Sequence, residues 1–191
     1  MKLILASQSP RRQELLKLFC RPFVVEAANV DEKMDDTQPA ASEVARVSRR
    51  KAEAVTREQE DVVIAADTIV VCDGRILGKP KSEEQAKAML TMLSGRAHQV
   101  MTGLTVARAD TVLSCTEVTD IWFRELTQRE IEAYVATGEP MDKAGAYGIQ
   151  GGAALFVQRL EGDYYNVMGL PVCRLWQMLG QIAPEWMEDT Q

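Results

Sequence analysis

The sequence predicts an α/β fold: one domain over residues 1–191, built on a mixed, twisted sheet flanked by helices. Short apolar runs of strand length alternate with segments of helical periodicity, which is the pattern of α/β proteins. Hairpin turn signals between some of the runs add antiparallel pairing. A chain of this length fits a single domain, and we find no repeat or Gly/Ser-rich linker that would divide it.

The first third of the chain alternates strand and helix. Residues 3–6 and 23–26 are short apolar runs typical of strands. Ser9 has the side chain of an N-cap and is followed by a proline, so we expect a helix over residues 10–19. Apolar residues at helical spacing predict a second helix over residues 40–57.

The middle of the chain predicts a strand, a hairpin turn and two capped helices. Residues 62–66 and 69–72 are apolar, and Asp73-Gly74 after them is a strong hairpin signal. Two capping-box patterns, a hydroxyl residue with Glu or Gln three positions later, open helices. They are Ser82 with Gln85, for a helix ending near Gly95, and Thr127 with Glu130, for a helix ending near Gly138.

The remaining elements are mostly strands. Residues 98–108 and 111–124 are rich in strand-forming residues, and residues 153–158 predict a further strand. Pro171 opens the last helix, which we expect to reach about Ile182.

Charge and composition exclude several classes of partner. Lys and Arg total 22 against 28 Asp and Glu, a net charge of −6, whereas nucleic-acid binding needs a dense basic patch. No apolar stretch reaches the roughly 18 residues of a membrane span, and the N-terminal apolar segment is too short for a signal peptide. The four cysteines show neither zinc-site spacing nor a secreted disulfide framework. We therefore expect a cytoplasmic protein without nucleic-acid or membrane partners.

Ser7-Gln8-Ser9-Pro10-Arg11-Arg12 is the most informative segment. A strand ends there, and a helix begins with two arginines in its first turn. Cations oppose the helix dipole at that end, whereas phosphate is attracted to it and matches the forked guanidinium donors. The segment therefore predicts a phosphate site. The alternative is two solvent-exposed arginines on an amphipathic helix.

Two carboxylates and two lysines are further candidates. Asp67 interrupts an apolar run, so a metal ion or a catalytic role would account for it, with an aspartate capping a turn at a strand end as the alternative. Glu32, in the loop after the second strand, offers the oxygens that magnesium or manganese prefers, or is ordinary loop acidity. Lys51 fits a solvated helix face as well as a phosphate contact. Lys79 lies in a rigid Gly-Lys-Pro loop from which it can reach a phosphate.

Residues 142–152 are rich in glycine but fit neither a P-loop nor a dinucleotide-binding fingerprint. This departure disfavours ATPases, GTPases and dinucleotide-binding enzymes. Tyr147 and Gln150 offer a ring to stack on a base and an amide to hydrogen-bond it. His98, the only histidine, has no partner at metal-site spacing, so we expect it to be structural. A Ser-His-Asp hydrolase is disfavoured because no nucleophile elbow is present.

Taken together, these segments resemble the Maf family of nucleotide pyrophosphatases, known also as septum-formation inhibitors. Six blocks match in family order between residue 3 and about residue 175. They are Leu5-Ala6-Ser7-Gln8-Ser9-Pro10-Arg11-Arg12, Ala66-Asp67-Thr68-Ile69-Val70, Gly78-Lys79-Pro80, Leu93-Ser94-Gly95 with His98 and Thr102-Gly103, Asp142 through Gly151, and Gly162 through Pro171.

The resemblance implies two lobes around a deep central cleft, a fold similar to that of inosine-triphosphate pyrophosphatases, and a divalent cation, Mg²⁺ or Mn²⁺. Asp67 matches the family's proton acceptor, and with Glu32 it is the expected metal ligand. Arg12, Thr68 and Gln150 match positions associated with base preference. The expected substrate-binding residues are Ser7, Arg11, Arg12, Lys51, Thr68, Lys79 and Gln150.

The glycine-rich block looks like that of the dTTP/UTP subgroup and differs from the 7-methyl-GTP subgroup. The resemblance thus implies a house-cleaning hydrolase that cuts dTTP and UTP, or modified pyrimidine nucleotides, into a monophosphate and pyrophosphate. We expect Asp67, directly or through the metal, to activate a water that attacks the α-phosphorus, while nearby cations offset the phosphate charge. Gln150 would read the carbonyl and ring N–H of uracil or thymine, a pattern that cytosine reverses.

Two alternatives stay open. One is a non-catalytic nucleotide-binding regulator of cell division, and the other is a pyrophosphatase for a different nucleotide, such as 7-methyl-GTP. The joint presence of Glu32 and Asp67 favours an enzyme over a regulator. A homodimer is the family habit, but the sequence itself does not reveal the oligomeric state.

Overall fold

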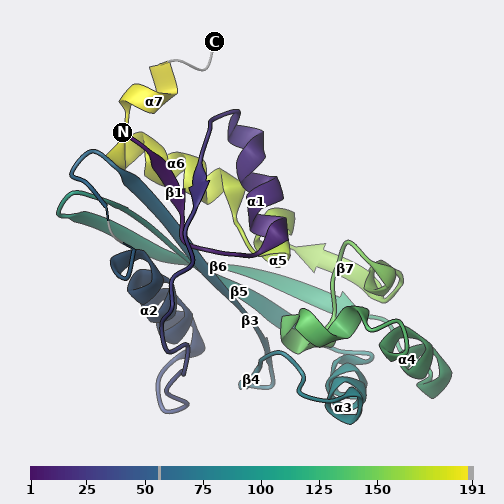
Figure 1. Ribbon diagram of the computed structural model, residues 1–191. Coiled ribbons are helices and arrows are strands. Elements are labelled where there is room, and N and C mark those ends of the chain that lie inside the picture. The colour runs from purple at the N-terminus through teal and green to yellow at the C-terminus, as the bar shows by residue number, and fades with distance from the viewer. Residues whose placement is uncertain (56, 189–191) are drawn as a thin grey trace. The chain divides into compact units, whose positions relative to one another are not determined.

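The computed structural model describes residues 1–55 and 57–188, and over them strands and helices alternate as predicted (Figure 1). The strands are β1 (Leu3–Leu5), β2 (Val24–Val25), β3 (Val62–Cys72), β4 (Arg75–Leu77), β5 (Ala97–Arg108), β6 (Thr111–Phe123) and β7 (Val157–Glu161). The α-helices are α1 (Pro10–Leu16), α2 (Ala40–Glu53), α3 (Glu83–Leu93), α4 (Gln128–Val135), α5 (Tyr164–Met168), α6 (Val172–Ile182) and α7 (Glu185–Glu188). Short 3₁₀ turns are η1 (Lys17–Phe19), η2 (Glu139–Asp142), η3 (Ala144–Ala146) and η4 (Gly152–Leu155).

The predicted mixed sheet is confirmed. Over the described residues it has seven strands in the order β2-β1-β3-β5-β6-β7, with β4 paired to β3. β1 lies parallel to both β2 and β3, whereas β4 and β7 pair antiparallel with β3 and β6. The predicted Asp73-Gly74 turn joins β3 to β4, and both of its residues have the positive φ that a type I′ hairpin requires.

The chain forms two compact units, each described by itself. The first comprises Met1–Asp67, Thr102–Glu117 and Gly169–Gln191, and the second comprises Thr68–Met101 and Val118–Met168. The chain passes from one to the other within β3, between two of the predicted site residues.

In the first unit, two successive residues of β6 contact helices on opposite faces of the strand. The Thr116 hydroxyl donates to the carbonyl of Ala41 in α2 at 2.6 Å, whereas Cys115 Sγ lies 3.6 Å from Met178 Sδ in α6. Successive strand side chains point to opposite faces, so α2 covers one face of this unit and α6 covers the other (Figure 1).

The packing of α2 on β5 is close because a glycine faces the helix. A Cβ on Gly103 would collide with the Val44 carbonyl of α2. Beside it, the Ser48 and Thr105 hydroxyls share a buried 2.8 Å hydrogen bond. This contact fixes the helix that carries Lys51.

The second unit has its own core beside α3 and α4, which lie side by side (Figure 1). At its centre, the His98 ring packs edge-on against Phe123, with ring centroids 4.9 Å apart, and against Tyr147 at 5.4 Å. All three side chains are buried.

The predicted helix caps differ in detail. Thr127 and Glu130 form the complete capping box. Ser82 accepts from the Gln85 N–H at 3.2 Å, but the Gln85 side chain accepts from the Lys81 N–H rather than from that of the cap. Ser9 is the N-cap residue of α1, yet within the described chain its side chain makes no capping hydrogen bond.

Four predicted boundaries need correction. The helix predicted over residues 10–19 is α-helical only to Leu16, and the helix predicted over residues 40–57 ends at Glu53, because Ala54 is already its cap. Residue 56 lies outside the described residues. The strand predicted over residues 153–158 is wrong, since η4 occupies its first part and β7 begins at Val157. The helix from Pro171 is not the last, since α7 follows it.

Candidate functional site

Ser7 and Arg12 connect the end of β1 to the first turn of α1. The Ser7 side chain is buried, and its Oγ accepts from the Ser9 N–H at 3.3 Å and from the Arg12 guanidinium at 3.2 Å. Arg12 Nε donates to the Gly169 carbonyl at 2.7 Å. Arg12 is therefore held on two sides, and the alternative of a solvent-exposed arginine is wrong for it.

Arg12 lies within electrostatic range of three other predicted site residues. Burial lowers the pKa of its guanidinium, the negative charges of Asp67 and Glu32 raise it, and the neighbouring Arg11 lowers it. A guanidinium stays protonated at any physiological pH. In the first unit, two cations and two acids therefore lie near the N-terminal turn of α1.

Lys51 joins the two acids. Its Nζ lies 2.6 Å from Asp67 Oδ1 and 2.8 Å from Glu32 Oε1. The side chains of Lys51 and Asp67 are only 8% and 12% exposed, whereas that of Glu32 is 58% exposed. Asp67 lies inside the continuous strand β3, so the alternatives of a solvated lysine and a turn-capping aspartate are both wrong.

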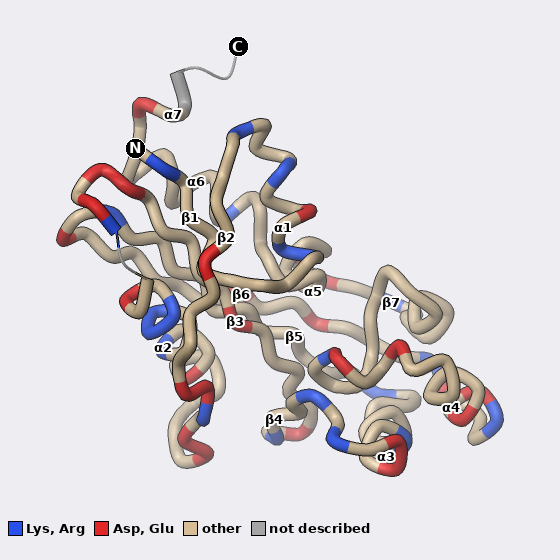
Figure 2. Tube along the Cα trace, viewed as in Figure 1, with Lys and Arg blue, Asp and Glu red and all other residues tan. Residues whose placement is uncertain are grey.

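The loop that carries Glu32 is tied to α2 by hydrogen bonds between its backbone and an ion pair of the helix. Arg46 donates to the Lys33 carbonyl at 2.9 Å and to Glu43 at 2.6 Å, while Glu43 also accepts from the Asp35 N–H at 2.7 Å. The hydrogen bonds from Arg46 and from the Asp35 backbone lower the pKa of Glu43 to about 2. Figure 2 shows the resulting mixture of basic and acidic residues along α2 and the loop before it.

The other predicted site residues belong to the second unit. Thr68 follows Asp67 in β3 and is half-buried, whereas Lys79 and Gln150 lie in loops and are exposed. The two loops are joined, because the Gly145 N–H donates to the Gly78 carbonyl at 3.1 Å. The expectation that these residues bind the same nucleotide as the first-unit cluster stays a prediction.

Comparison with known proteins decides the family. Residues 2–182 match the family described as Maf-like protein. The chain belongs to the Maf family. Its relatives include proteins named dTTP/UTP pyrophosphatase from Symbiobacterium thermophilum, 52% identical over 95% of this chain and 94% of that protein, and from Geobacillus sp., 52% identical over 91% and 94%. A third, from Bacillus cytotoxicus, is 49% identical over 94% and 95%.

Among solved structures, the Maf chain resembles the Staphylococcus aureus Ham1 protein. The TM-score is 0.51 at 16% identity, and the match covers 95% of this chain and 99% of that one. This likeness supports the fold alone.

The donor atoms of this Maf site suit a divalent cation. No group of three or more His, Cys, Asp or Glu residues that could hold a metal occurs in the part of the chain that the structure describes. Magnesium needs only one or two protein carboxylates when substrate phosphates supply further oxygens. Glu32 and Asp67 already share one cation, the Lys51 ammonium, so the chemistry of their oxygens fits such an ion.

The glycine-rich block of the Maf chain begins in the core. Tyr147 is buried, and its hydroxyl lies 2.8 Å from His98 Nε2. The predicted stacking of Tyr147 on a base is therefore wrong, because its ring faces other core rings. The structural role expected of His98 is confirmed, and burial lowers its pKa to about 4.

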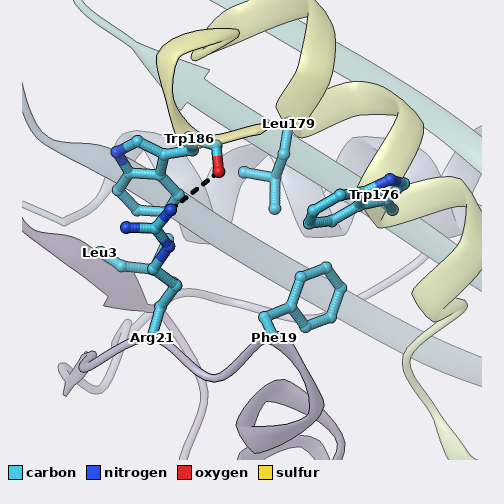
Figure 3. Close-up of a pocket in the computed structure, with 6 residues that line it drawn as sticks. All are labelled: Leu3, Phe19, Arg21, Trp176, Leu179 and Trp186. Atoms are coloured by element: carbon cyan, nitrogen blue, oxygen red, sulfur yellow. Dashed lines mark hydrogen bonds between the residues drawn. The ribbon is translucent and has the colours of Figure 1, made fainter. Parts of the chain in front are cut away.

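A small pocket in the first unit is no substrate site (Figure 3). Its volume of about 10 Å³ is that of a single water molecule at most. Arg21 crosses it to donate to the Trp186 carbonyl at 2.9 Å. None of the predicted Maf site residues lines it; its lining is Leu3, Phe19, Arg21, Trp176, Leu179 and Trp186.

The residues that hold the site loops of this Maf chain are hard to recognise from the sequence alone. Glu43 and Arg46 carry a weak signal, since opposite charges three apart on a helix attract each other. Tyr134 and Glu139, which contact the glycine-rich block, carry no signal in the sequence pattern. Their contacts become visible only in the folded chain.

No described helix of the Maf chain combines the length and the apolar character needed to cross a membrane.

Proposed function

We propose that this protein hydrolyses dTTP and UTP to the nucleoside monophosphate and pyrophosphate. One observation carries the proposal: a buried lysine joins Asp67 and Glu32, and both acids lie within electrostatic range of Arg12 in the first turn of α1. Relatives about half identical over most of the chain are named dTTP/UTP pyrophosphatase. Residues 1–191 then act as one catalytic domain.

The cations of the first unit can offset the negative charge of the triphosphate. A triphosphate resists a nucleophile because its own oxygens repel the attacking lone pair. Arg11 and Arg12 offer guanidinium donors to phosphate oxygens, and the Lys51 ammonium adds a point charge. Donors held in place before the reaction stabilise the charge that develops on the bridging oxygen without reorganising. Lys79 would add a fourth cation.

Asp67 is the proposed proton acceptor. It takes a proton from a water whose oxygen attacks the α-phosphorus, and the bond from that phosphorus to the bridging oxygen breaks. Pyrophosphate leaves, and Asp67 returns the proton to solvent. Lys51, which donates to Asp67 Oδ1, fixes the orientation of the carboxylate.

Glu32 and Asp67 are the proposed ligands of a divalent cation, Mg²⁺ or Mn²⁺. When bound, such an ion neutralises part of the triphosphate charge. The carboxylates then have to exchange the ammonium of Lys51 for the ion or share it, and the exposure of Glu32 allows that movement.

Base choice is proposed for Gln150, with Arg12 and Thr68. The Gln150 amide offers both an acceptor and donors, which suit the ring N–H and the carbonyl of uracil or thymine. Cytosine presents the reverse pattern, and unpaired polar groups discriminate strongly against it. A homodimer and a cytoplasmic location stay predictions from the sequence.

A nucleotide panel tests the proposal. Purified protein is assayed with dTTP, UTP, CTP, ATP, GTP and 7-methyl-GTP, with Mg²⁺, with Mn²⁺ and with EDTA, and the products are separated. We expect pyrophosphate and a monophosphate from dTTP and UTP, and no turnover in EDTA. Preference for 7-methyl-GTP would contradict the substrate. Tight UTP binding without any turnover would support the regulator instead.

A further inference from the structure

The glycine-rich block is held by one carboxylate outside the predicted site. Glu139 Oε2 accepts from the backbone N–H of Gly152 at 3.0 Å, and its Oε1 accepts from the hydroxyl of Tyr134 at 2.9 Å. That hydroxyl in turn accepts from the N–H of Gly148 at 3.2 Å. Glu139 therefore fixes the backbone on both sides of residues 149–151.

The glycines of the block give these groups room to approach. A Cβ on Gly151 would collide with the Glu139 carboxylate, and one on Gly148 would lie 2.7 Å from Lys143 Cε. The Lys143 ammonium donates to the Glu139 carbonyl at 2.8 Å. The Gly151 N–H closes a tight turn by donating to the Gly148 carbonyl at 3.1 Å. Together these contacts hold the backbone of the turn from both sides.

Gln150 lies at the exposed tip of this turn. Its amide presents an acceptor on one side and donors on the other, so a rotation of the turn would present the wrong group to a base. Selectivity of this kind depends on backbone position within about 0.5 Å. The group that sets the backbone then also sets the choice of base.

We propose that Glu139 is a positioning residue for pyrimidine selection: it holds the Gly148–Gly152 turn so that Gln150 presents its amide in one orientation. The inference rests on the proposed function. The Tyr134 hydroxyl connects the Glu139 carboxylate to the Gly148 N–H by one hydrogen bond to each. Neither residue contacts the nucleotide.

The hold requires a carboxylate, which makes a conservative test available. Glu139 accepts two hydrogen bonds, one with each oxygen. In Glu139→Gln, one oxygen becomes an NH₂ group that cannot accept. Facing Gly152, it would oppose a donor; facing Tyr134, it would leave that hydroxyl without the acceptor it uses now. One side of the turn is therefore released.

Selectivity is measured as the ratio of kcat/KM for UTP to kcat/KM for CTP. We expect Glu139→Gln to lower this ratio about tenfold, mainly through a higher KM for UTP, with kcat changed less than about threefold. Glu132→Gln, the same change on the exposed face of α4, is the matched control and should leave the ratio unchanged. Tyr134→Phe, which removes the hydrogen bond to Gly148 and keeps the one from Gly152 to Glu139, should lower it as well.

Gln150→Ala separates failure of the inference from failure of the proposed function. If this variant keeps the wild-type ratio, Gln150 does not read the base, and both proposals are overturned. If it lowers the ratio and Glu139→Gln does not, only the role of Glu139 is overturned. In the double variant, Glu139→Gln should cause no further drop, because its effect acts through Gln150.

Hydrogen exchange gives a readout that does not depend on turnover. In Glu139→Gln, the amide on the released side of the turn, Gly148 or Gly152, should exchange at least about tenfold faster, while those of β3 keep their wild-type rates. Unchanged exchange at both glycines would overturn the inference. Faster exchange throughout the chain would show that Glu139→Gln loses structure generally. Tyr134→Phe then decides: an unchanged ratio of UTP to CTP in that variant would overturn the inference.

Discussion

The two units hold their candidate functional residues by different kinds of interaction. In the first, Lys51, Asp67 and Glu32 hold each other by salt bridges, partly out of contact with water. In the second, the glycine-rich block is held by hydroxyls, a ring nitrogen, backbone amides and one carboxylate, Glu139. The first arrangement is a cluster of ion pairs, and the second is a network of hydrogen bonds that begins at the buried Tyr147 and ends at the exposed Gly152.

The difference matches the tasks proposed for each unit. Binding a triphosphate and a divalent cation requires charged groups that can exchange one partner for another. Choosing between two bases requires donors and acceptors that stay in place, because a shift of the backbone exchanges the right hydrogen bonds for unpaired groups. Under the proposal, the ion pairs of the first unit serve the chemistry, and the hydrogen-bonded block that Glu139 holds serves the choice of substrate.

The largest difference between the two units should appear when the Lys51 ammonium is removed. We expect Lys51→Met to lower kcat at least about 100-fold, because the two carboxylates lose their shared cation and the phosphates lose a donor. The free energy of unfolding should fall by about 3 kcal/mol, since Asp67 is left buried with less compensation. Steady-state kinetics and urea unfolding measure the two effects.

Arg49→Met is the control for this variant. Arg49 lies on the same helix, but its ion pair with Glu53 is exposed, and exposed pairs contribute about 0–1 kcal/mol. Its kcat should stay within about twofold of wild type. An active, stable Lys51→Met protein would show that the ion cluster is not part of the mechanism.

The buried His98 ring should make the stability of the second unit depend on pH. Burial lowers the pKa of His98 to about 4, whereas the unfolded chain takes up that proton near pH 6.5. The unfolded state therefore binds more protons between these values, and stability falls as the pH is lowered from 6.5 to 4. The loss is on the order of 3 kcal/mol at about 1.4 kcal/mol per pH unit.

His98→Gln should remove this loss, because glutamine keeps a polar group at the site but does not titrate. Urea unfolding of both proteins at several pH values measures the difference. Its neighbours Phe123 and Tyr147 do not interfere, since phenylalanine does not titrate and burial raises the pKa of Tyr147 above its usual range. Identical slopes in the two proteins would mean that His98 is not buried as a neutral ring.

The smallest effect concerns two helix caps. Thr127→Ala should lower the unfolding free energy by about 1 kcal/mol, because it removes the hydroxyl that accepts from the Glu130 N–H, while the Thr127 N–H still donates to the Glu130 carboxylate. Ser9→Ala should change it by only a few tenths of a kcal/mol, since the Ser9 side chain makes no capping bond within the described chain. Thermal unfolding without ligand compares them, and equal losses would contradict this account of α1.

Features that leave a local mark could be predicted from the sequence. The α/β class, the Asp73-Gly74 hairpin and the box at Thr127 follow from short patterns. Asp67 is conspicuous because an acid interrupts an apolar strand, and Arg12 because a cation lies in a first helical turn. In each case the sequence pattern lies within a few residues of the structural feature that it predicts.

Contacts between distant segments could not be predicted. The salt bridge from Lys51 to Glu32 depends on the path of a loop without regular structure. His98 and Tyr147 are 49 residues apart. Residues 153–158 were predicted as a strand because a short apolar run reads the same in a buried turn as in a strand, and Ala153 and Phe156 are buried within the turn and at its end.

Asp67→Asn tests the central claim most directly, because asparagine keeps an oxygen for Lys51 but cannot accept the proton of a water. Pyrophosphate release from UTP and calorimetric binding of UTP are measured on the same preparation, with circular dichroism to verify folding. The account predicts binding within a few-fold of wild type and a loss of turnover of at least about 1,000-fold. Turnover at the wild-type rate would remove Asp67 from the mechanism and with it the role assigned to the first unit.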